Sequence, residues 1–142
     1  MNFLTGINAT ASALSAEKIR MDIVAQNIAN ANTTKDTDGQ PYQRKMVSFE
    51  SMLRSGAAAQ TGSQNSPQGV RVSEVTNDPT PGEAIYNPGH PHAGADGMVR
   101  MPNVHIATEM VDLMSASRAY EANLSVVRNA RQMATKALNI GR

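Results

Sequence analysis

The sequence predicts a mainly α-helical protein with a small irregular β module, in which long N- and C-terminal helices pair as an antiparallel coiled coil. Near both ends of the chain, apolar and small residues recur at alternating steps of four and three, which places them on one stripe of a helix. Between these ends, short runs rich in β-branched residues are separated by Gly and Pro, a pattern typical of short strands and turns.

Residues 3 to 31 contain the first helical pattern. Apolar residues recur at every seventh position, and Ala11 and Ala25 between them would let a second helix approach closely. Lys18 interrupts the stripe, although its methylene stem can lie along a seam with its ammonium group at the edge. A run rich in Asn and Thr then favours caps and turns, so we expect the helix to end near residue 31.

Residues 35 to 101 are expected to form an extended middle segment. Within it, residues 42 to 53 begin as a strand and are expected to finish in a short helical turn at residues 49 to 53. Residues 55 to 69 have the Gly, Ala, Ser and Gln composition of a flexible linker. Further strands are expected at Val70–Val75, Ala84–Tyr86 and Met98–Met101.

Residues 104 to 140 carry the longer ladder, whose helix would extend roughly 55 Å at about 1.5 Å per residue. Pro102 restricts the residue before it, and the side chain of Asn103 is expected to cap the first turn. Gly141 follows the last apolar residue, where a left-handed C-cap needs no β-carbon. This length favours half of a rod-shaped hairpin, and an ordinary amphipathic helix on a globular core is the alternative.

The chain is therefore expected to divide into an N-terminal coiled-coil helix (residues 1–34), the middle segment (35–101) and a C-terminal coiled-coil helix (102–142). Both helices carry further apolar positions, such as Ile23 and Met114, that one helix pair cannot cover. Burying each such side chain against a neighbouring subunit would contribute roughly 1.5–3 kcal/mol. The expected assembly interface consists of Ile7, Leu14, Met21, Ile28, Met110, Leu113, Tyr120, Leu124, Val127 and Leu138.

The composition indicates a chain that completes its burial against copies of itself or partners. Leu, Ile, Val and Phe make up less than about a fifth of the 142 residues, as in core-poor chains, yet the net charge of +1 is not typical of disorder. No basic face or run indicates nucleic-acid binding, and no stretch has the apolar length of a membrane span. Cysteine is absent, and the N-terminus lacks the pattern of a cleaved secretory signal.

No pattern in the sequence indicates catalysis. No Ser lies in a nucleophile elbow, the Gly residues form no phosphate-binding loop before a helix, and acidic residues do not pair on one face. His90, His92 and Asp96 could bind Zn or Ni weakly, but an exposed turn loop also explains them. The sequence thus predicts no enzyme, cofactor or metal centre, and leaves weak metal binding at this loop open.

Three stretches of the chain contain distinctive runs of residues. Residues 12 to 34 include Asn-Ile-Ala-Asn followed by Asn-Thr, and residues 41 to 45 read Pro-Tyr-Gln-Arg-Lys. The third stretch combines Asn103, residues 109–114 and residues 118–123 with the closing residues 138–142. Together these runs resemble the flagellar rod and hook axial protein family, and within it the rod proteins of the basal body.

The resemblance covers both ends of the chain and is patchy in the middle. Gln43 stands where rod members usually have Arg, and His92 and Met98 stand where the family more often has Asp and Tyr. These departures affect expected subunit contacts of the middle module. The residues that carry the family motif are Asn27, Asn30, Asn32, Thr33, Pro41, Tyr42, Arg44, Lys45, Glu109, Asp112, Arg118, Tyr120, Glu121 and Asn123.

The resemblance implies a structural subunit of the flagellar proximal rod, the part of the drive shaft that crosses the periplasm and transmits motor torque. It implies export by the flagellar type III apparatus without a cleaved signal peptide. It also implies assembly with self-copies, other rod proteins and the rod–ring junction protein into a helical tube, with no nucleic acid and no direct membrane insertion. The heptads alone also allow a non-polymerising helical-hairpin adaptor that binds one partner helix.

Overall fold

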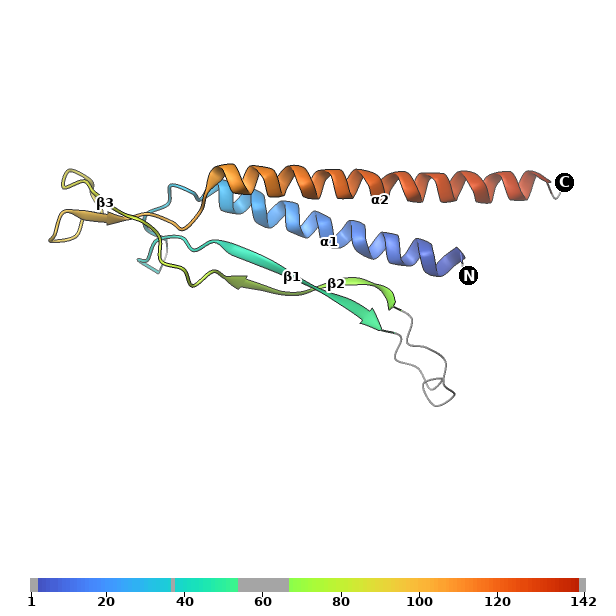
Figure 1. The fold of residues 1–142 in the computed structure, drawn as a ribbon, viewed down its shortest axis with the longest axis horizontal. Helices are drawn as coiled ribbons and strands as arrows, with labels where there is room; N and C mark the ends of the chain where they lie inside the picture. Colours follow the sequence, from blue (N-terminus) through green and yellow to red (C-terminus); the bar gives the residue numbers. More distant parts are fainter. Residues whose placement is uncertain (1–2, 37, 54–66, 141–142) are drawn as a thin grey trace. The chain divides into compact units, whose positions relative to one another are not determined.

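The computed structural model describes residues 3–36, 38–53 and 67–140. Two long helices account for most of the regular secondary structure, so the prediction of a mainly α-helical protein with a small β module is confirmed (Figure 1). In chain order the elements are α1 (Phe3–Ala29), β1 (Lys45–Leu53), β2 (Pro67–Asn77), β3 (Ala84–Tyr86), β4 (Met98–Arg100) and α2 (Ile106–Ile140).

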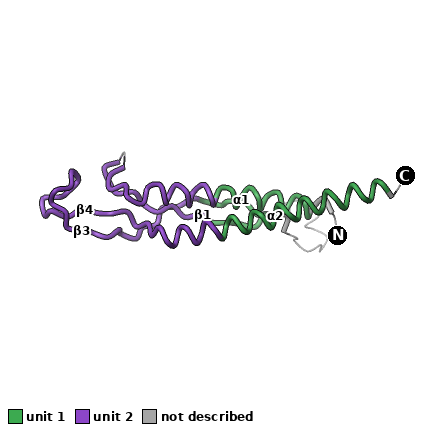
Figure 2. Tube along the Cα trace, turned by 90° about the horizontal axis from the view of Figure 1, so that it is seen from above, with its two compact units in different colours: residues 1–19, 48–74, 115–142 green, residues 20–47, 75–114 purple. Residues whose placement is uncertain are grey.

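The chain forms two compact units (Figure 2). Unit 1 comprises residues 1–19, 48–74 and 115–142, and unit 2 comprises residues 20–47 and 75–114. Each unit therefore contains part of both helices, and unit 2 also contains β3 and β4. The sequence predicts three consecutive segments, whereas each of these units combines separate stretches of the chain. The units therefore do not test the expected division, which stays a prediction.

The Asn-rich run after α1 ends the helix close to the predicted position. α1 stops at Ala29, and the next backbone N–H groups turn back onto it, from Asn30 to the Gln26 oxygen (3.0 Å) and from Ala31 to the Ile28 oxygen (3.2 Å). The Asn30 side chain also donates to the Gln26 oxygen (2.9 Å), as expected of a residue that competes for nearby backbone groups.

The start of α2 differs from the prediction. The first helical residue is Ile106, and the Glu109 N–H donates to the His105 oxygen (3.0 Å), so His105 occupies the N-cap position. The expected capping role of Asn103 is therefore wrong, and its side chain makes long-range contacts instead. The predicted C-cap at Gly141 lies outside the described residues.

β1 and β2 form a two-stranded sheet whose strands run in opposite directions (Figure 1). β1 continues through residues 49–53, so the predicted helical turn there is wrong. Pairing with β2 gives the extended backbone hydrogen bonds, and local residue preferences do not predict this pairing. β2 contains the predicted strand but begins at Pro67. Residues 67–69 of the expected linker thus belong to β2, and residues 55–66 lie outside the described part of the chain.

β3 and β4 pair antiparallel in unit 2, with Ala84 opposite Arg100 and Tyr86 opposite Met98, so the two short predicted strands are confirmed. The pairing extends past the strand ends, because the Met101 N–H donates to the Glu83 oxygen (2.8 Å). Close packing continues at Gly82, where an added Cβ would lie 1.8 Å from the Met101 oxygen. The backbone here has no room for a side chain.

The buried core of the described residues is thin. Its largest fully buried side chains are polar, namely those of Glu109 and Asn27. Small side chains remove little apolar area from water, at about 25 cal/mol per Å², so each contributes little hydrophobic stabilisation. The buried apolar residues are Ala16, Ala116 and Ala130 in unit 1 and Val24, Ala31, Tyr42 and Val99 in unit 2.

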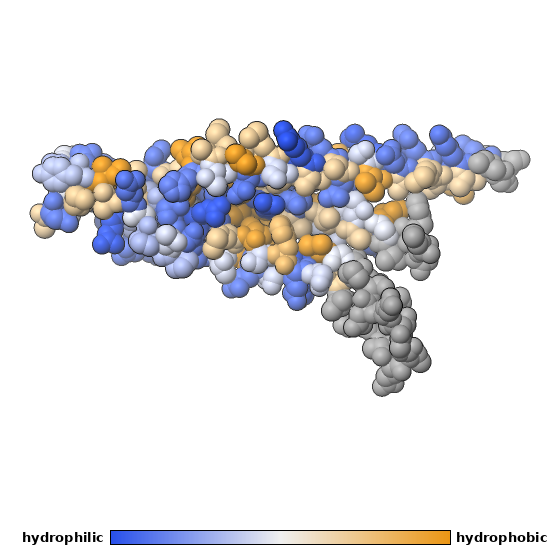
Figure 3. All heavy atoms as spheres, in the orientation of Figure 1, coloured by the Kyte–Doolittle hydropathy of each residue, from blue (hydrophilic) through white to orange (hydrophobic). Residues whose placement is uncertain are grey.

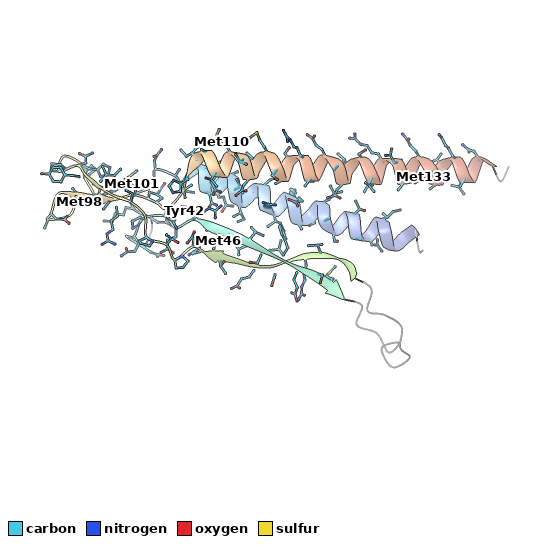
Figure 4. All side chains as sticks on the ribbon, in the orientation of Figure 1. Tyr42, Met46, Met98, Met101, Met110 and Met133 are labelled. Atoms are coloured by element: carbon cyan, nitrogen blue, oxygen red, sulfur yellow. The ribbon has the colours of Figure 1, made fainter. Side chains whose placement is uncertain are left out.

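Burial along α2 follows a stripe that only partly coincides with the predicted ladder. Glu109, Ala116 and Ala130 are buried, and they are spaced by multiples of seven. Of the expected interface residues, Met110 is 53% exposed (Figure 4) and Leu138 is 76% exposed, and the other eight are half-buried. The periodicity of large apolar residues misses this stripe because small and charged side chains occupy it. The assembly interface itself stays a prediction.

Candidate functional site

Polar side chains from three distant segments meet in unit 2. The last turn of α1 contributes Asn27, the segment leading into β1 contributes Tyr42 and Arg44, and the first turns of α2 contribute Glu109 and Asp112. Tyr42 is labelled in Figure 4, just before β1. We call these five residues the buried polar cluster. At its centre Glu109 is 0% exposed and Asn27 is 1% exposed.

Asn27 uses its complete hydrogen-bonding capacity. Its Nδ2 donates to the Lys45 backbone oxygen (2.9 Å) and to Glu109 Oε2 (3.0 Å). Its Oδ1 accepts from the Tyr42 hydroxyl (2.9 Å) and from the Lys45 backbone N–H (2.9 Å). A side-chain amide is the one neutral group with two donors and two acceptor sites in this geometry, so the site specifies Asn. It ties α1 to the start of β1 and to α2.

The Glu109 carboxylate is paired with Arg44. Arg44 Nε donates to Glu109 Oε1 (2.5 Å), and Arg44 Nη2 donates to Asp112 Oδ2 (3.2 Å). Arg20 Nη2 lies 3.8 Å from Asp112 Oδ1, which adds a second cation from α1. A carboxylate as buried as that of Glu109 needs both a neutralising cation and hydrogen-bond donors. Here Arg44 supplies the positive charge, and Asn27 supplies a further donor.

Tyr42 joins the cluster from the segment that precedes β1. Burial, followed by the negative charges of Asp36 and Glu109, raises the pKa of Tyr42 above its ordinary value of 10.0. The hydroxyl therefore keeps its proton at neutral pH and donates a hydrogen bond to Asn27 Oδ1. The Lys45 ammonium lies 6.0 Å from the centroid of the Tyr42 ring, at the outer limit of a cation–π contact.

Asn103 and Asp78 support the cluster, and sequence reasoning did not find these contacts. Asn103 Oδ1 accepts from the Arg44 backbone N–H (2.7 Å), and its Nδ2 donates to the Asp78 oxygen (3.3 Å). The Asp78 N–H in turn donates to the Arg44 oxygen (2.7 Å). The sequence signals for Asn103 were its position just before a helix, which local reasoning assigns to capping, and its place in the third family-like stretch, which carries no geometry.

The structure brings together only some of the family-motif residues. The cluster contains Asn27, Tyr42, Arg44, Glu109 and Asp112, with Lys45 joining through its backbone. The remaining members of unit 2 shape the turn between α1 and β1, where Thr33 Oγ1 donates to Asn30 Oδ1 (3.2 Å). Asn32 is exposed and Pro41 is half-buried in that connection. Four members belong to unit 1 and lie along α2, namely Arg118, Tyr120, Glu121 and Asn123.

The His90 loop has the geometry of a hydrogen-bonded turn. The His92 backbone N–H donates to His90 Nδ1 (3.1 Å), and His92 Nδ1 bonds the Thr34 hydroxyl (2.8 Å). Within the described residues, no group of three or more His, Cys, Asp or Glu side chains could hold a metal ion. Likewise, none of the described helices is long and apolar enough to cross a membrane.

The buried polar cluster has the chemistry of a structural joint. Protein groups, not an open cavity, take up the donors and acceptors of its most buried members. Sliding α1 along α2 would leave the Glu109 carboxylate buried without its partners, so the cluster opposes relative movement of these segments. The fold and the cluster together are those of a structural protein whose two long helices are joined by buried polar contacts.

Comparison with known proteins assigns the family. Residues 7–35 match the family model of the flagella basal body rod protein, and residues 95–140 match that of the flagellar basal body rod FlgEFG protein C-terminal region. The chain is similar to the flagellar basal-body rod protein FlgC of Bacillus subtilis, with 42% identity over 100% of both chains. It is also similar to the proteins of that name from Yersinia enterocolitica (41%) and Salmonella typhimurium (40%), in each case over 99% of both chains.

The two family models place both helical ends among the flagellar basal-body rod proteins. Because the identity extends over the whole chain, the protein belongs to the family of the flagellar basal-body rod protein FlgC. The resemblance predicted from the sequence motifs is thus confirmed.

Proposed function

We propose that this protein is a structural subunit of the bacterial flagellar basal-body rod and resides in the flagellar basal body. The observation that carries the proposal is 40–42% identity, over 99–100% of the chain, to relatives that bear that name. Its role is mechanical and not enzymatic, which agrees with a central site made of mutually satisfied polar groups.

The buried polar cluster suits a subunit that transmits torque. A rotating rod loads its subunits laterally and along their length, and helices that slip past one another would dissipate that load. In unit 2, Asn27 and Arg44 connect α1, the start of β1 and α2 to one buried carboxylate. Displacing any of these segments separates a buried charge from its partners, at a cost of about 3–5 kcal/mol.

The terminal helices pair as an antiparallel coiled coil in this proposal. Two contacts in unit 2 support the opposite directions: Asn27 meets Glu109, whereas the earlier Arg20 meets the later Asp112. In unit 1 the buried helical positions are occupied by Ala, which is compatible with close approach of helices.

Exposed apolar side chains support assembly through the helices. In unit 2, Ile106, Met110 and Met114 follow one another at steps of four on α2 and are exposed, as is Val111. Figure 3 shows hydrophobic surface over the first turns of α2. Contact with a neighbouring subunit would remove such side chains from water, and full burial of each would contribute about 1.5–3 kcal/mol. We therefore assign the tube wall of the proximal rod to these helices, with the predicted interface residues at subunit contacts.

The partners follow from the same assignment. The protein contacts other components of the basal-body rod, and in the finer form of the proposal these are copies of itself, other rod proteins and the rod–ring junction protein. The flagellar type III apparatus exports the chain before assembly. Exposed apolar surface and a thin core agree with a chain that completes its burial only in the assembled rod.

Mass spectrometry of hook–basal bodies, purified from the source cells by detergent and alkaline extraction, tests the main proposal. We expect this chain in the particles at a fixed ratio to other rod proteins. Its absence from intact particles, together with recovery in the soluble fraction, would overturn the rod assignment and favour the helical-hairpin adaptor.

Leu124→Asp tests the predicted interface, because Leu124 belongs to the ladder and is half-buried on α2. The charge should prevent incorporation into basal bodies, measured by immunoblotting of purified particles and by swimming of a complemented strain. Ser125→Asp introduces the same residue at the adjacent exposed position and should incorporate normally. Equal incorporation of both variants would show that the ladder does not face a subunit contact.

A further inference from the structure

Charge is divided unequally between the two units, which are green and purple in Figure 2. The residues of unit 1 include eight Lys and Arg and four Asp and Glu, which gives a net charge of +4. Those of unit 2 include five Lys and Arg and eight Asp and Glu, which gives −3. The nearly neutral chain is therefore composed of a basic unit and an acidic unit, and copies can attract one another through unlike units.

The basic charge of unit 1 is concentrated on the last part of α2. After Glu121 the described helix contains Arg128, Arg131 and Lys136 and no acidic residue, and all three basic side chains are exposed. Apolar side chains accompany them, because Met133 is 59% exposed and Leu138 is the most exposed of the large hydrophobic residues described. We call residues 128–138 the basic end of α2.

Unit 2 has an open cleft of about 690 Å³ that offers the opposite charge and a similar apolar character. Asp78 and Glu83 lie at its border, and Ile85, Val104 and Ile106 contribute apolar lining. Arg44 also borders the cleft, but Glu109 and Asp112 already neutralise its charge. The cleft therefore presents negative charge beside exposed aliphatic surface.

Asp78 is held in its charged form by its own turn. Its Oδ1 accepts the Thr80 backbone N–H (2.9 Å), and hydrogen bonds from Thr80 lower the pKa of the Asp78 carboxyl below its ordinary value of 3.8. The negative charge at the cleft border thus persists throughout the physiological pH range.

We propose that the basic end of α2 of one copy docks, head to tail, into the acidic cleft of unit 2 of a second copy. The inference rests on the proposed rod function and adds a specific contact between subunits. A basic helix with exposed Met and Leu side chains matches an acidic cleft with aliphatic lining in both charge and polarity. The two surfaces belong to different parts of one chain, so the contact is heterologous and can propagate as a helical array.

Two charge-reversing variants test the contact in the purified full-length protein. Arg131→Glu with Lys136→Glu inverts the basic end, and Asp78→Asn with Glu83→Lys inverts the cleft while retaining an acceptor for Thr80. Sedimentation equilibrium should show that the wild type self-associates at about 0.05 M salt and less so at about 0.5 M. Each variant should weaken self-association by about tenfold or more.

Mixing the two variants gives the decisive result. The basic-end variant retains an intact cleft and the cleft variant an intact basic end, so an equimolar mixture should associate again. The two reversed surfaces are also opposite in charge to each other, which adds to the attraction in the mixture. Lys18→Glu removes the same kind of charge from another exposed position of unit 1 and should leave self-association unchanged. The milder Arg131→Gln with Lys136→Gln repeats the test if the reversal lowers helix content in circular dichroism.

The proposal is overturned if the wild type does not self-associate at low salt, if both variants associate like the wild type, or if the mixture fails to pair. Incorporation into basal bodies separates this outcome from the rod assignment. A basic-end variant that enters the particles like the wild type would refute the docking contact alone. Absence of the wild-type chain from the particles would instead refute the rod function.

Discussion

Replacing Arg44 with alanine removes the guanidinium group that neutralises Glu109, while the Glu109 carboxylate remains 0% exposed. The variant loses the Arg44 bonds to Glu109 (2.5 Å) and to Asp112 (3.2 Å), and Glu109 keeps the amide of Asn27 (3.0 Å). Removing one partner of a buried ion pair costs about 3–5 kcal/mol. The Arg44 side chain is 24% exposed, so water reaches the pair from its side and we expect the lower value of about 3 kcal/mol.

Urea unfolding followed by the circular dichroism of the helices measures this loss. With an m-value of about 2 kcal/mol/M, a loss of about 3 kcal/mol lowers the unfolding midpoint by about 1.5 M. Combining Arg44→Met with Glu109→Gln removes both charges and keeps an acceptor for Asn27, so part of the loss should be recovered.

The matched control is Arg71→Ala. Arg71 pairs with Glu50 at 2.9 Å, but both side chains are more than half exposed, so this substitution should cost less than about 1 kcal/mol. Equal and small losses for the two Arg variants would show that Glu109 does not depend on Arg44. The interpretation of the cluster as a structural joint would then be refuted.

Three further substitutions probe the same unit. Asn27→Asp replaces two donated hydrogen bonds with a second carboxylate beside a buried one and should cost at least about 2 kcal/mol at neutral pH in urea unfolding, whereas unchanged stability would contradict the hydrogen-bond assignment. Because the pKa of Tyr42 is raised in the folded state, the stability contributed by its hydroxyl is complete below pH 10.0 and is lost as the pH rises through the higher folded-state pKa. Tyr42→Phe should therefore cost about 1 kcal/mol at pH 8 and show a smaller further loss above pH 10 than the wild type in the same assay. Gly82→Ala should lower the melting temperature and cost about 1–3 kcal/mol because its Cβ would lie 1.8 Å from a backbone oxygen, whereas Gly89→Ala, whose Cβ would meet no atom closer than 3.8 Å, should be tolerated.

Local chemistry determined where the helices form. The steps of four and three predicted both helices, and the Asn-rich run after α1 ended it within about two residues of the expected place. The strands β2, β3 and β4 were predicted for the same reason, because runs of β-branched residues between Gly and Pro residues favour an extended backbone locally. Motif resemblance singled out Asn27, Arg44 and Glu109, although it supplied no geometry for them.

Positions that depend on distant partners were predicted poorly. Asn103 was assigned to a helix cap because its neighbours in sequence suggest one, yet its partners are Arg44 and Asp78. Residues 49–53 were given a helical turn, but pairing with β2 makes them extended. In each case the hydrogen-bonding partner lies far away in the sequence, so local sequence patterns do not reveal it.

The sequence by itself determined the mainly helical class, the positions of both long helices and the family to which the chain belongs. These features follow from periodicity, from the Asn-rich run after α1 and from residue motifs, all of which act over a few turns of backbone. The tertiary structure decided which residues form the core, where Glu109 and Asn27 take the centre in place of large apolar side chains. Their burial is possible only because Arg44 and Tyr42 arrive from a distant segment to satisfy charge and hydrogen bonds, and only the folded chain brings those segments together.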